Sequence, residues 1–190
     1  MSAPDIDQRV MDRFAPLTGD AHLTILLGAG ASAPSGLPNW DQFARRVAVL
    51  SGLVGNESAA SILLSHQDQT IVLEAARARS GERWGKLLND ALYSGLSADP
   101  TPSPLHLAAV GHYLAAPATT TLSTLNFDTL LESAVSDTGE PVVVSFGGGT
   151  RDALPTVHHL HGAIYGEVAY NTVVGFRDYA ELVADEKAWQ

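Results

Sequence analysis

The stretch HLTILLGAGASAPSGLPNW, which runs from His22 to Trp40, decides the fold of this chain. Its first six residues form a short apolar run that Gly28 ends, and such a run predicts a buried strand entering a turn. A glycine-rich loop follows from Gly28 to Pro38, and apolar side chains at helical spacing then predict a helix from Trp40 to Leu50. The predicted order is therefore strand, glycine loop and helix.

The rest of the chain continues the alternation of helices and strands. Residues 56–116 have a helical period, with Ser103 and Pro104 as the N-cap and first residue of the last helix. Helices are also expected at residues 6–14 and after residue 126. Four runs rich in apolar and β-branched residues predict further strands: Thr119–Thr124, Pro141–Phe146, Thr156–His161 and Thr172–Phe176. This pattern predicts an α/β, Rossmann-like fold: a largely parallel sheet flanked by helices, with a helical insertion at about 56–116.

The length and composition indicate one compact domain spanning residues 1–190. With 11 Lys and Arg against 21 Asp and Glu the formal charge is −10, which would repel a phosphate backbone, so we expect no direct binding of nucleic acid by this domain. The acidic start of the chain lacks the basic region of a signal peptide, and no apolar run reaches the roughly 20 residues of a membrane span. We therefore expect a cytoplasmic protein that makes no contact with a membrane.

The glycine loop has a chemical as well as a structural interpretation. The segment Gly28-Ala29-Gly30-Ala31-Ser32 places small residues and backbone N–H groups between a strand and a helix, where a pyrophosphate can approach closely. The alternative is a tight strand-to-helix turn with no ligand. A dehydrogenase would also use such a loop, but it requires an acid at the end of the next strand, about 20 residues on, whereas Asp41 lies on the predicted helix.

Three motifs occur in the order that one known family shows. GAGASAPSGLPNW, from Gly28 to Trp40, resembles the opening motif of the sirtuins and their bacterial sirtuin-like relatives. STLNFD, from Ser123 to Asp128, resembles the family's T-x-N-x-D block, and LHG, from Leu160 to Gly162, resembles its histidine-glycine block. The resemblance spans about Leu23 to Gly175 and implies that this chain binds NAD as a substrate.

The resemblance also implies roles for individual residues. Asn126 would hold the nicotinamide ribose and the attacking water, His161 would be the general base, and Asp128 would support the ribose pocket or anchor its loop. The implied cofactor-binding residues are Gly28, Ala29, Gly30, Ala31, Ser35, Asn39 and Asp128. Departure of nicotinamide leaves a cationic, oxocarbenium-like ribose, which favours oriented dipoles and a base with a pKa of about 7. An asparagine amide both donates and accepts without adding charge, and a histidine supplies the base.

Structural alternatives stay open for these side chains. Asn126 could cap the helix that starts near Phe127, and Asp128 could favour the same helix N-terminus through its dipole. His158 and His159 are expected as strand residues, one facing each side of the sheet. Together with His161 they could suggest a metal site, but no Cys or closely spaced acid completes one, so we expect no metal.

Two departures separate this chain from the sirtuin deacylases. Asn39-Trp40-Asp41 follows Pro38, where those enzymes carry an acid and an arginine. The chain contains no cysteine, so it cannot build their zinc ribbon, and we expect no zinc. The resemblance therefore implies the branch found in bacterial anti-phage proteins, which hydrolyse NAD to nicotinamide and ADP-ribose and so deplete the cell of NAD.

Two alternative functions remain: an NAD-dependent ADP-ribosyltransferase or deacylase, and a non-catalytic module that senses NAD or ADP-ribose. For the hydrolase we expect a homo-oligomer or a complex with a partner defence subunit, and further protein beyond residue 190. Trp40 is expected to pack at the rim of the pocket. Gly147–Asp152 is expected to form a flexible loop between two strand ends that could cover Asn126 and His161.

Overall fold

The computed structural model describes residues 22–146 and 154–184. The expected helix at residues 6–14 and the expected loop at Gly147–Asp152 lie outside these ranges. The strands are β1 (Leu23–Leu27), β2 (Thr120–Thr124), β3 (Val143–Phe146), β4 (Thr156–His159), β5 (Ala163–Tyr165) and β6 (Val168–Tyr170). The helices are α2 (Ala29–Ser32), α3 (Trp40–Leu50), α4 (Glu57–His66), α5 (Gln69–Ser80), α6 (Trp84–Tyr93), α7 (Pro104–Ala115), α8 (Leu130–Ser136) and α9 (Phe176–Ala184), with 3-10 turns at Ala33–Ser35 and Gly81–Arg83.

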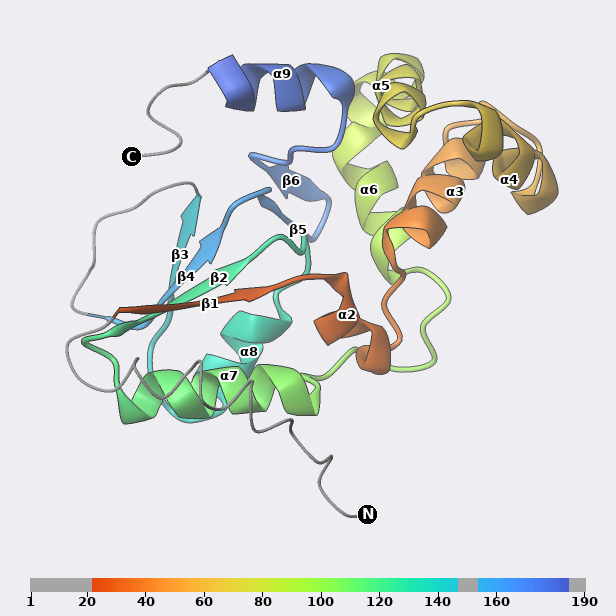
Figure 1. Cartoon of the computed structure of the whole chain (residues 1–190). Coiled ribbons are helices and arrows are strands. Elements are labelled where there is room, and N and C mark those ends of the chain that lie inside the picture. The colour runs from red at the N-terminus through yellow and green to blue at the C-terminus, as the bar shows by residue number, and fades with distance from the viewer. Residues whose placement is uncertain (1–21, 147–153, 185–190) are drawn as a thin grey trace, which may run out of the picture.

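The central feature is a four-stranded, all-parallel sheet with the order β1-β2-β4-β3. Leu26 pairs with Ser123, and Ser123 pairs with His158, so the carboxyl ends of the strands gather at one edge (Figure 1). Helices flank this sheet and connect its strands. The prediction of an α/β, Rossmann-like fold with a largely parallel sheet is confirmed.

Local sequence explains where two key helices begin. At the start of α3, the Asn39 side chain accepts from the Gln42 backbone N–H at 2.9 Å, and the Gln42 side chain accepts from the Asn39 N–H at 2.9 Å. This reciprocal capping box satisfies two N–H groups that a helix start otherwise leaves unpaired. At α7 the N-cap is Ser103 and the first helical residue is Pro104, as predicted.

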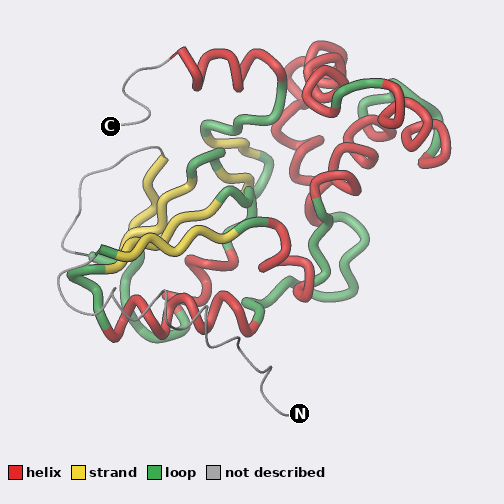
Figure 2. The backbone as a smooth tube through the Cα atoms, in the orientation of Figure 1, coloured by secondary structure: helices red, strands yellow, loops and turns green. Residues whose placement is uncertain are grey.

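Three hydrophobic clusters hold the helices, which are red in Figure 2, in place. One lies between the sheet and α7 with α8, where Leu122 and Val157 of the strands meet Val110 and Leu131 of the helices. The second lies among α3, α5 and α6 and reaches Phe127 at the end of the sheet. The third joins α3, α4 and α5 through Ala48, Ala60 and Val72. The predicted helical insertion at about 56–116 therefore divides: α4 to α6 pack with α3, whereas α7 packs on β2 and α8 as a layer of the sheet.

The predicted strand at Thr172–Phe176 is wrong. Residues 171–175 form no strand, and α9 already begins at Phe176. The Asp178 carboxylate accepts from the backbone N–H groups of Val174 and Gly175 at 3.1 and 2.9 Å, so these donors serve the start of α9 instead of a strand. The apolar character of the run has another cause, because Val174 is fully buried in the core between α5 and α6.

An antiparallel hairpin, β5 and β6, which the sequence analysis did not predict, precedes residues 171–175. It turns at Gly166, which has a positive φ of 60°, between the paired residues Tyr165 and Val168. The predicted strand Thr156–His161 is also shorter than expected, since β4 ends at His159 and His161 lies in the following turn.

The first strand differs from its prediction in burial. The apolar run at β1 predicts a strand covered on both faces, but β1 lies at an edge of the sheet and Leu26 is 51% exposed. Among residues 22–146 and 154–184, α7 and α8 cover the face of β1 that carries Leu27. Within the described part of the chain, no helix is long and apolar enough to cross a bilayer.

Candidate functional site

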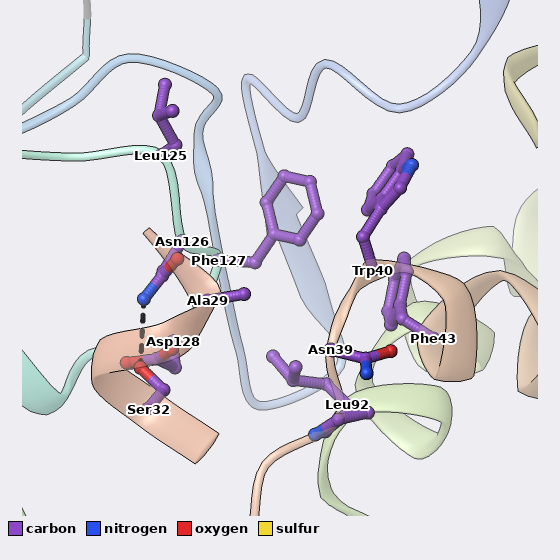
Figure 3. A pocket seen from close by; sticks show the side chains of 11 residues that line it. Ala29, Ser32, Asn39, Trp40, Phe43, Leu92, Leu125, Asn126, Phe127 and Asp128 are labelled. Carbon is purple, nitrogen blue, oxygen red and sulfur yellow. Dashed lines mark hydrogen bonds between the residues drawn. The ribbon is translucent and has the colours of Figure 1, made fainter. Parts of the chain in front are cut away.

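A pocket lies at the carboxyl ends of β1 and β2, bounded by α2, α3 and α6 (Figure 3). Its empty volume is about 380 Å³, which includes the part open to solvent. Its lining residues are Ala29, Ser32, Pro38, Asn39, Trp40, Phe43, Leu92, Leu125, Asn126, Phe127 and Asp128. Parallel α/β sheets commonly bind ligands at this edge.

Asn126 is held rigidly at the end of β2. Its side-chain amide donates to the Gly28 carbonyl at 3.1 Å and to the Ser32 hydroxyl at 2.9 Å, while its backbone N–H donates to the Thr124 hydroxyl at 2.9 Å. A carbonyl oxygen only accepts, so the Gly28 contact determines which side of the amide carries the nitrogen. The amide oxygen of Asn126 is therefore the atom left to accept a hydrogen bond in the pocket.

The alternative that Asn126 caps a helix is wrong. Helix α8 begins at Leu130 with Thr129 as its N-cap, and the Asn126 side chain bonds to the β1–α2 segment instead. Asp128 takes the local role, because its carboxylate accepts from the Leu130 backbone N–H at 3.1 Å. This contact agrees with the prediction that Asp128 favours the helix N-terminus and anchors its loop.

Asp128 is 5% exposed and lines the same pocket. Burial raises the pKa of Asp128 above its ordinary value, although hydrogen bonds from the Ser32 side chain and the Leu130 backbone act in the opposite direction. Ser32 therefore bridges the two polar groups: it accepts from Asn126 and donates to Asp128. The Ser32 hydroxyl thus orients both side chains through hydrogen bonds, without a charged residue between them.

Aromatic rings form the other wall of the pocket. Trp40 stacks on Phe43 with ring centroids 5.8 Å apart, and both rings lie against Phe127 at 6.2 and 5.7 Å. Figure 3 shows these rings opposite the Asn126 amide. The expectation that Trp40 packs at the pocket rim is confirmed.

The implied cofactor-binding residues are divided by the structure. Ala29, Asn39 and Asp128 line the pocket, and Gly28 contributes the carbonyl that orients Asn126. The other three residues do not line it: Gly30, Ala31 and Ser35. Ala31 is buried in the core against α7 and α8, and the Ser35 hydroxyl donates to the Thr101 carbonyl at 2.6 Å.

His161 stands apart from the lining of this pocket. It lies in the half-buried turn after β4, where its ring meets the edge of Tyr179 of α9 with centroids 5.5 Å apart. Burial lowers the pKa of His161 below its ordinary value, so its imidazole is neutral and able to accept a proton at neutral pH. The structure thus brings Asn126 and Asp128 together but does not place His161 with them.

Sequence reasoning missed three polar residues near the site. Ser32 stood inside the quoted glycine motif, and its contact with Asn126 depends on the fold. His159 and Glu132 form a buried pair behind Asn126, with His159 only 1% exposed. Burial lowers the pKa of His159, but the hydrogen bond and charge of Glu132 outweigh it and raise the pKa overall. The sequence signal that could have revealed this pair is Glu132, an acid inside the apolar helix segment LLESAV.

No group of three or more His, Cys, Asp or Glu residues among residues 22–146 and 154–184 is arranged to hold a metal ion. His158 and His159 are strand residues on β4, as expected, and His159 points toward α8. Comparison of the chain with models of known protein families gives no match, and neither does comparison with curated proteins. The fold and the site define an α/β protein with a polar and aromatic pocket at the carboxyl edge of a parallel sheet.

Proposed function

We propose that this chain binds NAD and hydrolyses its nicotinamide–ribose bond, acting as the NAD-depleting effector of anti-phage defence. The observation that carries the proposal is the Asn126 amide, which Gly28 and Ser32 orient in a pocket that also holds the Asp128 carboxyl. The three sequence motifs that resemble the sirtuin-like family are the reason for proposing NAD as the substrate and a role in defence.

The pocket suits the reaction chemically. The amide oxygen of Asn126 can accept from a ribose hydroxyl or a water, and its dipole adds no net positive charge beside a cationic transition state. The planar nicotinamide ring can lie against the wall formed by Trp40 and Phe127. His161 would take the proton of the attacking water, since burial lowers its pKa and so leaves its imidazole neutral at neutral pH.

The glycine motif gives a second line of support. Gly28 and Gly30 have no positive φ, and a Cβ added at either one would meet nothing within 4 Å. Neither backbone conformation nor packing within the described chain therefore requires glycine there. Glycine inside a helix costs about 1 kcal/mol relative to alanine, so a ligand that approaches the backbone closely is a reason for its presence.

The direct test is to incubate the purified protein with NAD and to quantify nicotinamide and ADP-ribose by chromatography. We expect the two products in equal amounts, with no release from NAD alone. A protein that binds NAD in calorimetry but releases no nicotinamide would contradict hydrolysis, and one that does neither would reject the proposal as a whole.

Replacing Gly30 by alanine separates a ligand-binding loop from a plain turn. We expect Gly30→Ala to raise stability by up to about 1 kcal/mol, because alanine is the better helix residue and has room for its Cβ. NAD affinity should fall about tenfold or more if a phosphate approaches this backbone. Denaturant unfolding and calorimetry measure the two effects, and a stabilised variant with unchanged affinity would favour the turn without a ligand.

Replacing His161 by alanine tests the assignment of the base. We expect His161→Ala to lower nicotinamide release by about 10²-fold with NAD binding retained, in the range of a lost general base. The matched control is His112→Ala at an exposed position of α7, which should leave release unchanged. Near-normal release by a folded His161→Ala protein would remove His161 from the mechanism.

The position of His161 also favours a second candidate function. Because its ring packs on Tyr179 and does not line the pocket with Asn126, the pocket could bind NAD or ADP-ribose without turning it over. Such a module would sense the nucleotide. Binding without release in the assay above, combined with no effect of His161→Ala on affinity, would select this function over hydrolysis.

A further inference from the structure

His159 makes side-chain contacts with the backbones of two separate segments. Its Nδ1 lies 3.1 Å from the carbonyl oxygen of Asn126 and 3.1 Å from that of Gly162. Both partners only accept, so Nδ1 must carry the hydrogen and donate to both. One imidazole therefore bridges the start of the β2–α8 connection and the turn that follows β4.

Glu132 fixes the other side of the same ring. Its Oε1 contacts His159 Nε2, and both side chains are buried, with Glu132 contributed by α8 and His159 by β4. The second carboxylate oxygen, Oε2, is buried and has no hydrogen-bond partner among the described residues. A buried carboxylate with one unpaired oxygen lowers the stability of the fold, so stability does not explain its presence. We infer that its role is to hold the imidazole.

The two bridged segments are the ones that carry the proposed chemistry. Asn126 supplies the oriented amide of the pocket, and Gly162 directly follows His161, the proposed base. Backbone hydrogen bonds already join these segments, from Leu160 N–H to Thr124 O at 3.0 Å and from Ile164 N–H to Phe127 O at 2.7 Å. His159 adds a link at the carbonyl of Asn126 itself.

We propose that His159, held by Glu132, is a positioning residue that fixes the Asn126 and His161 segments relative to each other. The expected change in kcat rests on the proposed hydrolysis of NAD. Neither His159 nor Glu132 contacts NAD in this proposal. Loss of the bridge should misplace Asn126 against the base while leaving the pocket able to bind.

Replacing His159 by glutamine or asparagine tests the Nε2 contact with Glu132 and the Nδ1 contacts with the two carbonyls separately. His159→Gln places its amide near the Nε2 position, so it keeps a partner for Glu132 but loses the donor to the two carbonyls. His159→Asn places a donor near Nδ1 and keeps that bridge. We expect kcat for nicotinamide release to fall at least ~10-fold in His159→Gln, with KM within about threefold, and to stay within about fivefold in His159→Asn.

Two further variants serve as controls. Val157→Ala shortens an equally buried side chain of β4 that is apolar and cannot donate to either carbonyl, so it should lower stability and leave kcat unchanged. Glu132→Gln keeps a neutral hydrogen bond to His159 and should retain kcat within about threefold. Unchanged kcat in His159→Gln, or a large loss in Glu132→Gln as expected of a proton-transfer group, would overturn the positioning role.

Amide hydrogen exchange tests the bridge without the reaction. We expect the protected amides of Leu125 and Ile164 to exchange at least ~10-fold faster in His159→Gln, relative to amides of α7, and not in Val157→Ala. If the wild type releases no nicotinamide, the proposed function fails, whereas faster exchange in both segments would still support the bridge. Unchanged exchange in His159→Gln would overturn it.

Discussion

Replacing Asn126 by alanine is expected to lower nicotinamide release by about 10² to 10³-fold, the loss typical of one preorganised dipole at a reacting centre. Asn126 is 8% exposed and both of its amide hydrogens are engaged, by Gly28 and Ser32, so its amide oxygen is already oriented before substrate arrives. Alanine removes that acceptor and leaves the Gly28 carbonyl without its side-chain donor.

The measurement is kcat and KM for release of nicotinamide by the folded variant. The loss should appear in kcat more than in KM, because the dipole is needed most as charge develops on the ribose. The matched control is Asn56→Ala, which removes another asparagine, the N-cap of α4. It should cost about 1 kcal/mol of stability through the lost cap and leave release unchanged. Wild-type release by Asn126→Ala would remove the central residue of the proposed mechanism.

Replacing Gly162 by alanine is expected to destabilise the fold by about 4 kcal/mol or more, which places it among the most damaging single substitutions. Gly162 has a φ of +79°, a conformation that disfavours any side chain. A Cβ there would also collide with the backbone carbonyl oxygens of Tyr170 and Asn171. Backbone atoms of the hairpin and its exit cannot rotate away as a flexible side chain would.

Urea unfolding followed by circular dichroism measures this effect, and Gly139→Ala is the matched control. Gly139 has a similar φ of +85°, but a Cβ there meets nothing within 4 Å. Gly139→Ala should lower the free energy of unfolding only by the cost of placing alanine at a positive φ, about 1 to 2 kcal/mol. Equal losses in the two variants would show that the close approach of Tyr170 and Asn171 does not restrict position 162.

These two predictions differ in how far the sequence could lead to them. Asn126 could be singled out from the STLNFD block, because a polar cluster directly after a β-branched run marks the carboxyl end of a strand. That Gly162 must be glycine was not visible, since its constraint comes from Tyr170 and Asn171 in a hairpin that the pattern did not reveal. Sequence patterns predict the geometry of neighbouring residues, whereas Gly162 is restricted by residues eight and nine positions further along the chain.

The wrong strand at Thr172–Phe176 has the same origin. The run is apolar because Val174 fills the core between α5 and α6, and its backbone donors are taken by Asp178. Periodicity alone cannot distinguish a buried loop from a buried strand, since both remove apolar side chains from water. The edge position of β1 was hidden for a similar reason, because its apolar run resembles that of a central strand.

The sequence by itself determined the alternation of strands and helices, the parallel sheet that this order requires, and the edge at which Asn126 and Asp128 meet the glycine loop. These follow from side-chain periodicity, capping residues and chain connectivity, which act over short separations. Tertiary structure alone decided that Ser32 joins Asn126 to Asp128, that Glu132 holds His159 behind them, and that His161 packs on Tyr179. Each of these contacts depends on the angle and distance between packed elements, and a hydrogen bond or ring contact changes over a few tenths of an ångström that no spacing in the sequence records.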